Sequence, residues 1–102
     1  MLSKIELFNA RNASNAISAG LEIKVNSVGS YTDEDKDGNP VTVSVLKATD
    51  GELYTCISAT VAESLDMLED CIADSETGVV TVRVIESVSN NGRKFYQLKI
   101  IA

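Results

Sequence analysis

Hydrophobic and polar residues alternate along much of this 102-residue chain, with the period of two that is typical of half-buried β-strands. The pattern predicts strands over 4–8, 21–25, 41–45, 53–57, 79–88 and 95–101. In the second of these the alternation slips after Asn26, and Gly29 follows, which indicates a bulge or bend in a long strand. The segment 9–18 is rich in Asn, Ala and Ser, and we expect a loop there rather than a weak helical turn.

One stretch has the period of a helix. Thr60 and Glu63 have the spacing of a capping box, in which a hydroxyl and a carboxylate satisfy the first backbone amides. The apolar residues that follow recur at helical spacing, while acidic residues take the other side and Gly78 ends the region. The predicted buried stripe is Val61, Leu65, Leu68 and Ile72.

Turn signals join the predicted strands into hairpins. Asp-Gly and Asn-Pro pairs lie within 33–40, and Asn91-Gly92 precedes the last strand. The resulting order is mainly β: an OB-fold-like five-stranded Greek-key barrel with one α-helix after the third barrel strand, plus a short N-terminal strand. An open α+β sheet with the helix on one face is the alternative. The length predicts a single domain over residues 1–102.

The composition argues against catalysis. The chain has no His, which removes the commonest general base and zinc ligand, and it has neither a nucleophile elbow nor a phosphate-binding Gly-rich loop. We therefore expect a non-enzymatic protein without a cofactor. No run approaches the roughly 18 apolar residues of a membrane span, and Lys4 and Glu6 stand where a secretory signal would be apolar. In an intracellular protein Cys56 and Cys71 are then expected to be free thiols.

The formal charge of −6 argues at first against a nucleic-acid partner. The charge is unevenly distributed, however. Twelve of the 15 acidic residues lie between 31 and 76, where only two of the nine basic residues occur. The remainder of the chain is net basic, so a local phosphate-binding surface is compatible with the sequence.

The acidic turn after Tyr31 begins like a calcium-binding loop. Asp33, Asp35, Asp37 and Gly38 match the first half of an EF-hand loop, but Ser44 stands where the bidentate Glu is required. The three aspartates are thus a weak metal candidate. The alternative is an acidic hairpin turn in which Asp side chains bond to their own backbone.

Binding of single-stranded nucleic acid needs flat rings on which bases stack and cations that follow the phosphates. The alternative role for each aromatic ring is to fill the hydrophobic core. Tyr96 is in phase with Leu98 and Ile100, so we predict that it belongs to the core. The candidate rings are Tyr31, Tyr54 and Phe95. The candidate cations are Lys47, Arg93 and Lys94, followed by Lys4, Arg11 and Lys24.

Several segments, in order and at similar spacing, carry a resemblance. They are 4–10, the region of Tyr31, Asp50-Gly51-Glu52-Leu53-Tyr54-Thr55, Ile57-Ser58, Thr60-Val61-Ala62-Glu63, Val82-Arg83-Val84, and Asn91-Gly92 with Phe95 and Leu98. Together they resemble the single-stranded DNA-binding proteins of small protein-primed Bacillus phages. The chain differs from that pattern in lacking most of the N-terminal extension and in a shorter, more acidic loop after Tyr31.

The resemblance implies an OB-like barrel that coats and protects single-stranded viral DNA during replication, without reading its sequence, in the cytoplasm of the bacterial host. It implies that Tyr31 and Tyr54 stack on bases. Single-stranded DNA is the expected partner, with phage replication proteins and self-association as further candidates and no membrane contact. The alternative function is a non-enzymatic protein-interaction module, stabilised by calcium at the turn 33–38.

Overall fold

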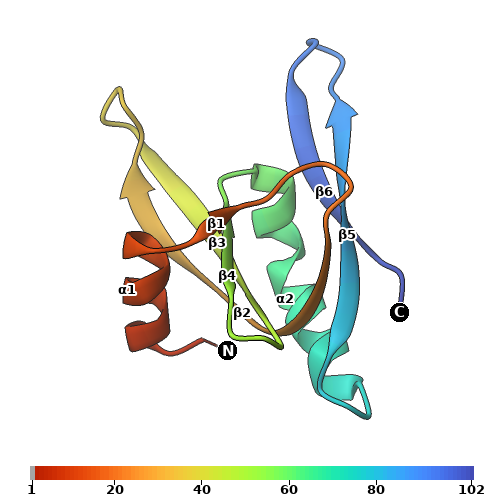
Figure 1. The fold of residues 1–102 in the computed structure, drawn as a ribbon. Helices are drawn as coiled ribbons and strands as arrows, with labels where there is room; N and C mark the ends of the chain where they lie inside the picture. Colours follow the sequence, from red (N-terminus) through yellow and green to blue (C-terminus); the bar gives the residue numbers. More distant parts are fainter. Residues whose placement is uncertain (1) are drawn as a thin grey trace.

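A computed structural model describes residues 2–102 and contains two helices and six strands within that range (Figure 1). The helices are α1 (Lys4–Asn12) and α2 (Ala59–Asp74). The strands are β1 (Asn15–Ala16), β2 (Glu22–Glu34), β3 (Pro40–Ala48), β4 (Leu53–Cys56), β5 (Val80–Val88) and β6 (Lys94–Ile100).

The strands form one curled sheet in the order β1-β4-β3-β2-β5-β6. All neighbours are antiparallel except β1 and β4, which are parallel. The mainly β architecture is confirmed, and α2 lies between β4 and β5, where the sequence predicted the single long helix. The prediction of an OB-fold-like five-stranded Greek-key barrel is confirmed only as far as a mainly β, curled sheet with a helix. Within residues 2–102 the sheet has six strands, and its order ends at β1 on one side and at β6 on the other.

The predicted strand over 4–8 is wrong, because these residues lie in α1. Ser3 begins this helix with a capping box: its side chain accepts from the amide of Glu6, and the Glu6 carboxylate accepts from the amide of Ser3, each at 3.2 Å. The predicted loop over 9–18 is wrong in part, since α1 continues to Asn12. Beyond the helix, Asn15 and Ala16 pair with Tyr54 and Thr55.

Strand β2 is long enough to serve both halves of the sheet. Its first residues pair with β5, and from Val25 onward it pairs with β3. The register shifts between Val25 and Ser27, which confirms the predicted bulge. Gly29 lies beyond the bulge and has another role: a Cβ there would lie 3.1 Å from both the Cβ of Leu2 and the Cδ2 of Leu7. The absence of a side chain lets the N-terminal segment pack closely on β2.

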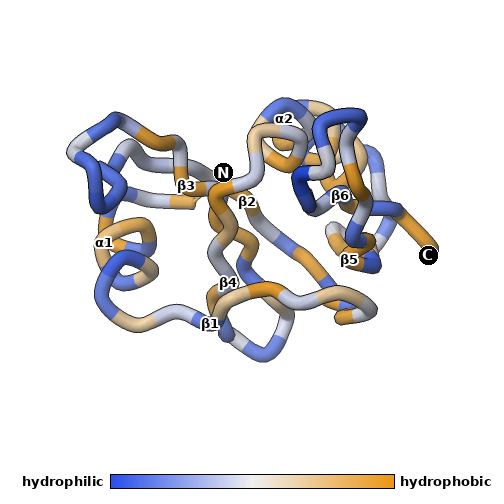
Figure 2. Tube along the Cα trace, turned by 90° about the horizontal axis from the view of Figure 1, so that it is seen from above, coloured by the Kyte–Doolittle hydropathy of each residue, from blue (hydrophilic) through white to orange (hydrophobic). Residues whose placement is uncertain are grey.

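The core has two parts, one on each face of the sheet. The larger part lies between the sheet and α2, and includes Val61, Leu65 and Leu68 from the predicted helical stripe. The smaller part contains Leu2, Ala10 and Val45, and lies beneath α1. Figure 2 shows α2 between the β2–β3 side of the sheet and the β5–β6 side.

The start of α2 differs from the sequence prediction. The N-cap is Ser58, not Thr60, and no side chain accepts from the first amides of the helix. The Ser58 hydroxyl instead donates to the carbonyl of Tyr96 at 2.9 Å, which ties the helix to β6. The prediction placed the start at Thr60 on the capping-box spacing alone. The contact that holds Ser58 joins it to β6, a segment 38 residues away in the sequence, so no local spacing reveals it.

Both cysteines are free thiols, as expected. Burial raises the pKa of the Cys56 thiol, and the Ser58 amide that donates to its sulfur at 3.3 Å opposes that effect. Neither helix in residues 2–102 is long and apolar enough to cross a membrane.

Candidate nucleic-acid interface

An open cleft of about 490 Å³ lies between the β5–β6 hairpin and the start of α2. We call it the β5–β6 cleft; residues 56–60 and 93–96 line it. It brings together three of the predicted contacts, Arg93, Lys94 and Phe95. An adjoining pocket shares Ile57 and Ala59 with it and continues toward β3. The open surface therefore extends from the β5–β6 hairpin across the start of α2.

The cleft also contains a ring that the sequence assigned to the core. Tyr96 lines the cleft while it packs against the larger part of the core. The prediction rested on the alternation along the strand, and it is confirmed for the side of this half-buried ring that faces the core. The other side of the ring is open because β6 is an edge strand. That position depends on the order of strands in the sheet, which the local pattern does not reveal. Ile57, which is 66% exposed, adds apolar surface beside the rings.

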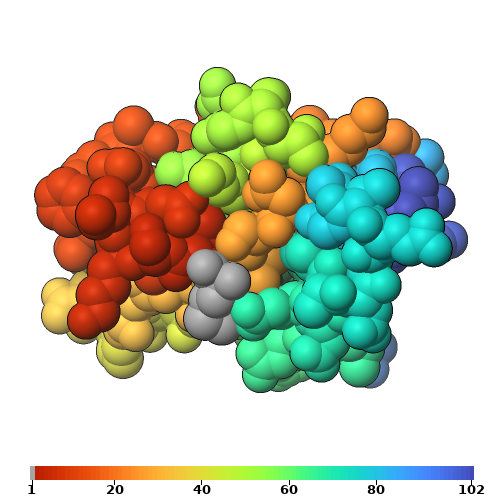
Figure 3. All heavy atoms as spheres, turned by 90° about the horizontal axis from the view of Figure 1, so that it is seen from below, coloured from red at the N-terminus to blue at the C-terminus, as the bar shows by residue number. Residues whose placement is uncertain are grey.

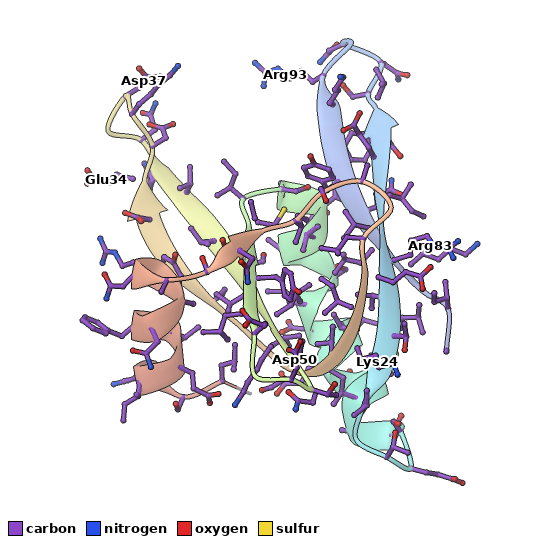
Figure 4. All side chains as sticks on the ribbon, viewed as in Figure 1. Lys24, Glu34, Asp37, Asp50, Arg83 and Arg93 are labelled. Carbon is purple, nitrogen blue, oxygen red and sulfur yellow. The ribbon has the colours of Figure 1, made fainter. Side chains whose placement is uncertain are left out.

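The two cations of the cleft differ in how firmly they are held. Lys94 approaches Glu86 at 3.8 Å, and its side chain is 74% exposed. Such a surface pair contributes little stability, so a phosphate can replace the carboxylate. Within residues 2–102, the side chain of Arg93 makes no ion pair. Figure 4 shows it at the tip of the β5–β6 hairpin, far from the labelled Lys24.

Four other predicted contacts lie around α1. Lys47 donates to Glu6 at 2.6 Å, and Arg11 donates to Asp33 at 3.4 Å. The bond from Lys47 is the main cause that lowers the pKa of the Glu6 carboxyl, with the backbone bond from Ser3 next.

Tyr31 packs against the smaller part of the core, beneath α1. Burial and the nearby Asp33 carboxylate raise its pKa, and Arg11 opposes them. Lys4 is exposed on α1.

Tyr54 and Lys24 line a third, separate pocket of about 250 Å³. The carboxylates of Glu22 and Asp50 lie in the same pocket, and Figure 4 shows Asp50 beside Lys24. Glu22 is already bound by Arg83, whose Nη2 donates to it at 2.6 Å. With Glu22 and Arg83 paired, the Asp50 carboxylate still stands against the Lys24 ammonium, so this pocket attracts phosphate less than the β5–β6 cleft does.

The structure does not bring Tyr31 and Tyr54 together. Tyr31 pairs with Val43, and Tyr54 pairs with Leu46, three residues further along β3. Successive side chains of a strand point to opposite faces, so the two rings lie on opposite faces of the sheet. Their membership of the two separate core clusters agrees with this.

The aspartates of the acidic turn are engaged in holding its backbone. The Asp35 carboxylate accepts from the amides of Asp37 and Asn39, both at 2.9 Å, and Asp33 accepts from the amide of Glu34 at 2.8 Å. No group of three or more metal-ligating side chains forms a metal site in the part of the chain that the structure describes. The geometry is that of an acidic hairpin turn.

Aromatic rings beside exposed cations, in an open cleft on a curled β-sheet, are the combination with which proteins bind single-stranded nucleic acid. Comparison with known proteins agrees. Residues 1–101 match the family described as "Phage Single-stranded DNA-binding protein", and the chain belongs to that family. No solved structure matches it.

Two relatives show how far the similarity extends. The single-stranded DNA-binding protein of Bacillus phage phi29 is 30% identical over 104 residues, which cover 95% of this chain and 84% of the relative. That of Bacillus phage B103 is 26% identical over 105 residues, covering 96% and 86% respectively. These findings confirm the resemblance that the sequence segments carried.

Proposed function

We propose that the protein coats single-stranded DNA without sequence preference during phage replication, in the cytoplasm of the bacterial host. The observation that carries the proposal is the assembly of Arg93, Lys94, Phe95 and Tyr96 in one open cleft. Stacking on such rings is sequence-tolerant because every base has a flat face.

In this proposal the bases lie against Phe95, Tyr96 and Ile57. The phosphates lie toward Arg93 and Lys94. The first turn of α2 carries no acidic residue, so its free backbone amides reinforce the positive potential of these two side chains. The stacking roles of Tyr31 and Tyr54, and the phosphate roles of Lys24, Lys47 and Arg11, stay predictions.

We infer further that the sheet is an OB-like barrel that is open between β4 and β6. The order of five of its strands, β4-β3-β2-β5-β6, supports this, as does the helix between β4 and β5. A single unit of this kind occludes roughly 4–16 nucleotides. Phage replication proteins and further copies of the chain are proposed partners.

Titration with oligothymidine tests the proposal. The chain has no Trp and three Tyr, so its intrinsic fluorescence comes from tyrosine. We expect oligothymidine to quench this fluorescence at low salt, because Tyr96 lines the cleft, and to shift the protein in a native gel. Duplex DNA of the same length is the control and should bind more weakly. Unchanged fluorescence together with no gel shift would refute the proposed function.

A further inference from the structure

The outer face of α1 is an unusual surface for this acidic protein. Phe8 is 66% exposed and Ile5 is 74% exposed, three residues apart on one side of the helix. Exposed Asn9 and Asn12 lie on the same side. A ligand that covers this exposed apolar ring removes it from water, which stabilises the complex.

Two cations flank this ring on the helix, and one of them, Arg11, is paired with Asp33. Lys4 and Arg11 lie four residues before and three residues after Phe8, so both flank it on the helix. The only acidic residue of α1 is Glu6, and it bonds to Lys47 across the helix–sheet contact. The arrangement therefore favours a ligand that combines flat apolar groups with negative charge.

The position of α1 supports a role of its outer face in DNA binding. The helix packs over the smaller part of the core, which includes Tyr31, the ring that the resemblance predicts to stack. Figure 3 shows the atoms of α1 forming the outer surface of one side of the molecule, away from α2. The outer face of α1 and Tyr31 therefore lie on the same side of the sheet.

We propose that Phe8 is a base-stacking residue of a second contact for single-stranded DNA, with Lys4 and Arg11 binding the adjacent phosphates. This inference rests on the proposed function. Arg11 reaches the phosphate by leaving Asp33, because a part-exposed surface pair at 3.4 Å contributes little stability. A second protein copy is a less suitable occupant, since the chain is net acidic and an exposed ring flanked by cations is matched by nucleobases and phosphates.

Phe8→Trp gives a direct test, because it places the sole tryptophan of the chain at this position. We expect saturating oligothymidine to quench the tryptophan emission of this variant at least twofold. The matched control is Met67→Trp, at a 73% exposed position on the acidic helix α2, whose emission should not change. Phe8→Ala should weaken binding of a long oligothymidine about fivefold. Ile5→Ala, which removes exposed apolar surface without removing a ring, should change it less than twofold.

The outcomes separate this inference from the proposed function. If the gel shift shows binding but the tryptophan emission of Phe8→Trp stays constant and Phe8→Ala binds normally, the second contact is refuted while the proposed function stands. If the emission of Phe8→Trp instead changes with protein concentration in the absence of DNA, another copy covers the ring and the inference is likewise refuted. If the unmodified chain does not bind oligothymidine at all, the proposed function fails and this inference fails with it.

Discussion

The two long hairpins of the sheet are built alike and charged oppositely. β2–β3 and β5–β6 stand on either side of the start of α2, and each turns at a glycine with positive φ, Gly38 and Gly92 (Figures 1 and 2). The turn of β2–β3 contains Asp35 and Asp37, whereas that of β5–β6 leads into Arg93 and Lys94. The net charge of −6 therefore describes neither hairpin.

The difference shows which charges serve the fold. In the β2–β3 turn the Asp35 carboxylate holds two backbone amides, so an acidic residue has a structural role there. In the β5–β6 turn the neutral hydroxyl of Ser89 accepts from the amide of Arg93 at 3.3 Å. The side chain of Arg93 takes no part in closing its own turn. It is available for a ligand, and substitutions in the two hairpins test this contrast.

Reversing both charges of the basic hairpin should have the largest effect. Arg93→Glu with Lys94→Glu should weaken oligothymidine binding about 100-fold at low salt, because two phosphate contacts become repulsive. The negative slope of log affinity against log salt should become shallower by about 1.4, at roughly 0.7 per lost contact on a single strand. Fluorescence titrations at several salt concentrations measure both quantities.

The matched control is Lys36→Glu, which reverses an exposed cation in the turn of the opposite hairpin. Through the screened repulsion that charges at this turn exert across solvent, its affinity should fall only about threefold at low salt, far less than that of the double variant, and the loss should vanish at high salt. Equal losses in the control and in the double variant would mean that binding follows net charge, and the contrast between the hairpins would have no functional meaning.

Removing the Phe95 ring from the cleft should have the next largest effect. Phe95→Leu keeps an apolar side chain and eliminates the stacking surface, so the affinity should fall by about 1–3 kcal/mol with an unchanged salt slope. Phe95→Tyr is the control and should bind normally. Thermal unfolding of both variants verifies the fold, since Phe95 is half-buried. If a folded Phe95→Leu variant bound oligothymidine normally, Phe95 would not be part of the interface.

Neutralising the acidic hairpin should have a smaller effect of the opposite sign. Glu34→Gln with Asp37→Asn removes two exposed charges; Figure 4 shows Asp37 at the β2–β3 tip across from Arg93 and Glu34 below it, at the end of β2. Binding should strengthen about threefold at low salt, and the gain should vanish at high salt because the charges act through solvent. A gain that persisted at about 1 M salt, where the Debye length is only about 3 Å, would indicate direct contact between this turn and DNA.

Acidification should produce the smallest effect, on the docking of α1. The pKa of Glu6 is lowered from 4.5 in the folded protein, so its ionised form stabilises the docked helix. That stabilisation is present above pH 4.5 and is lost as the pH falls through the lowered value. A part-exposed ion pair of this kind contributes at most about 1 kcal/mol. Hydrogen exchange of α1 should quicken over that range, and Glu6→Gln should remove the pH dependence.

The elements predicted correctly are those whose pattern lies within one continuous segment of the sequence. The stripe of α2, the bulge of β2 and the Asn91-Gly92 hairpin all follow from spacing within one segment. The error at α1 has a specific cause. Five alternating residues are too few to distinguish a strand from a helix, and the capping-box spacing of Ser3 and Glu6 was the available signal for the helix.

The candidate site was less predictable because it depends on which segments meet. Phe95, Arg93 and Lys94 are adjacent in sequence, and the structure keeps them together in one cleft. Tyr31 and Tyr54 are 23 residues apart, and the register of β3 between them decides that they face opposite ways. The pairing of Lys47 with Glu6 was equally hidden, since it depends on where α1 packs.

The most direct test of the central claim maps DNA contacts on the whole chain. An ¹⁵N-labelled sample titrated with a short oligothymidine reports every backbone amide at once. We predict that the largest chemical-shift changes fall in residues 56–60 and 93–96, the two segments of the β5–β6 cleft, while the acidic turn 35–39 stays unchanged. Changes concentrated in the acidic turn or on the acidic face of α2, with none in 93–96, would contradict the account.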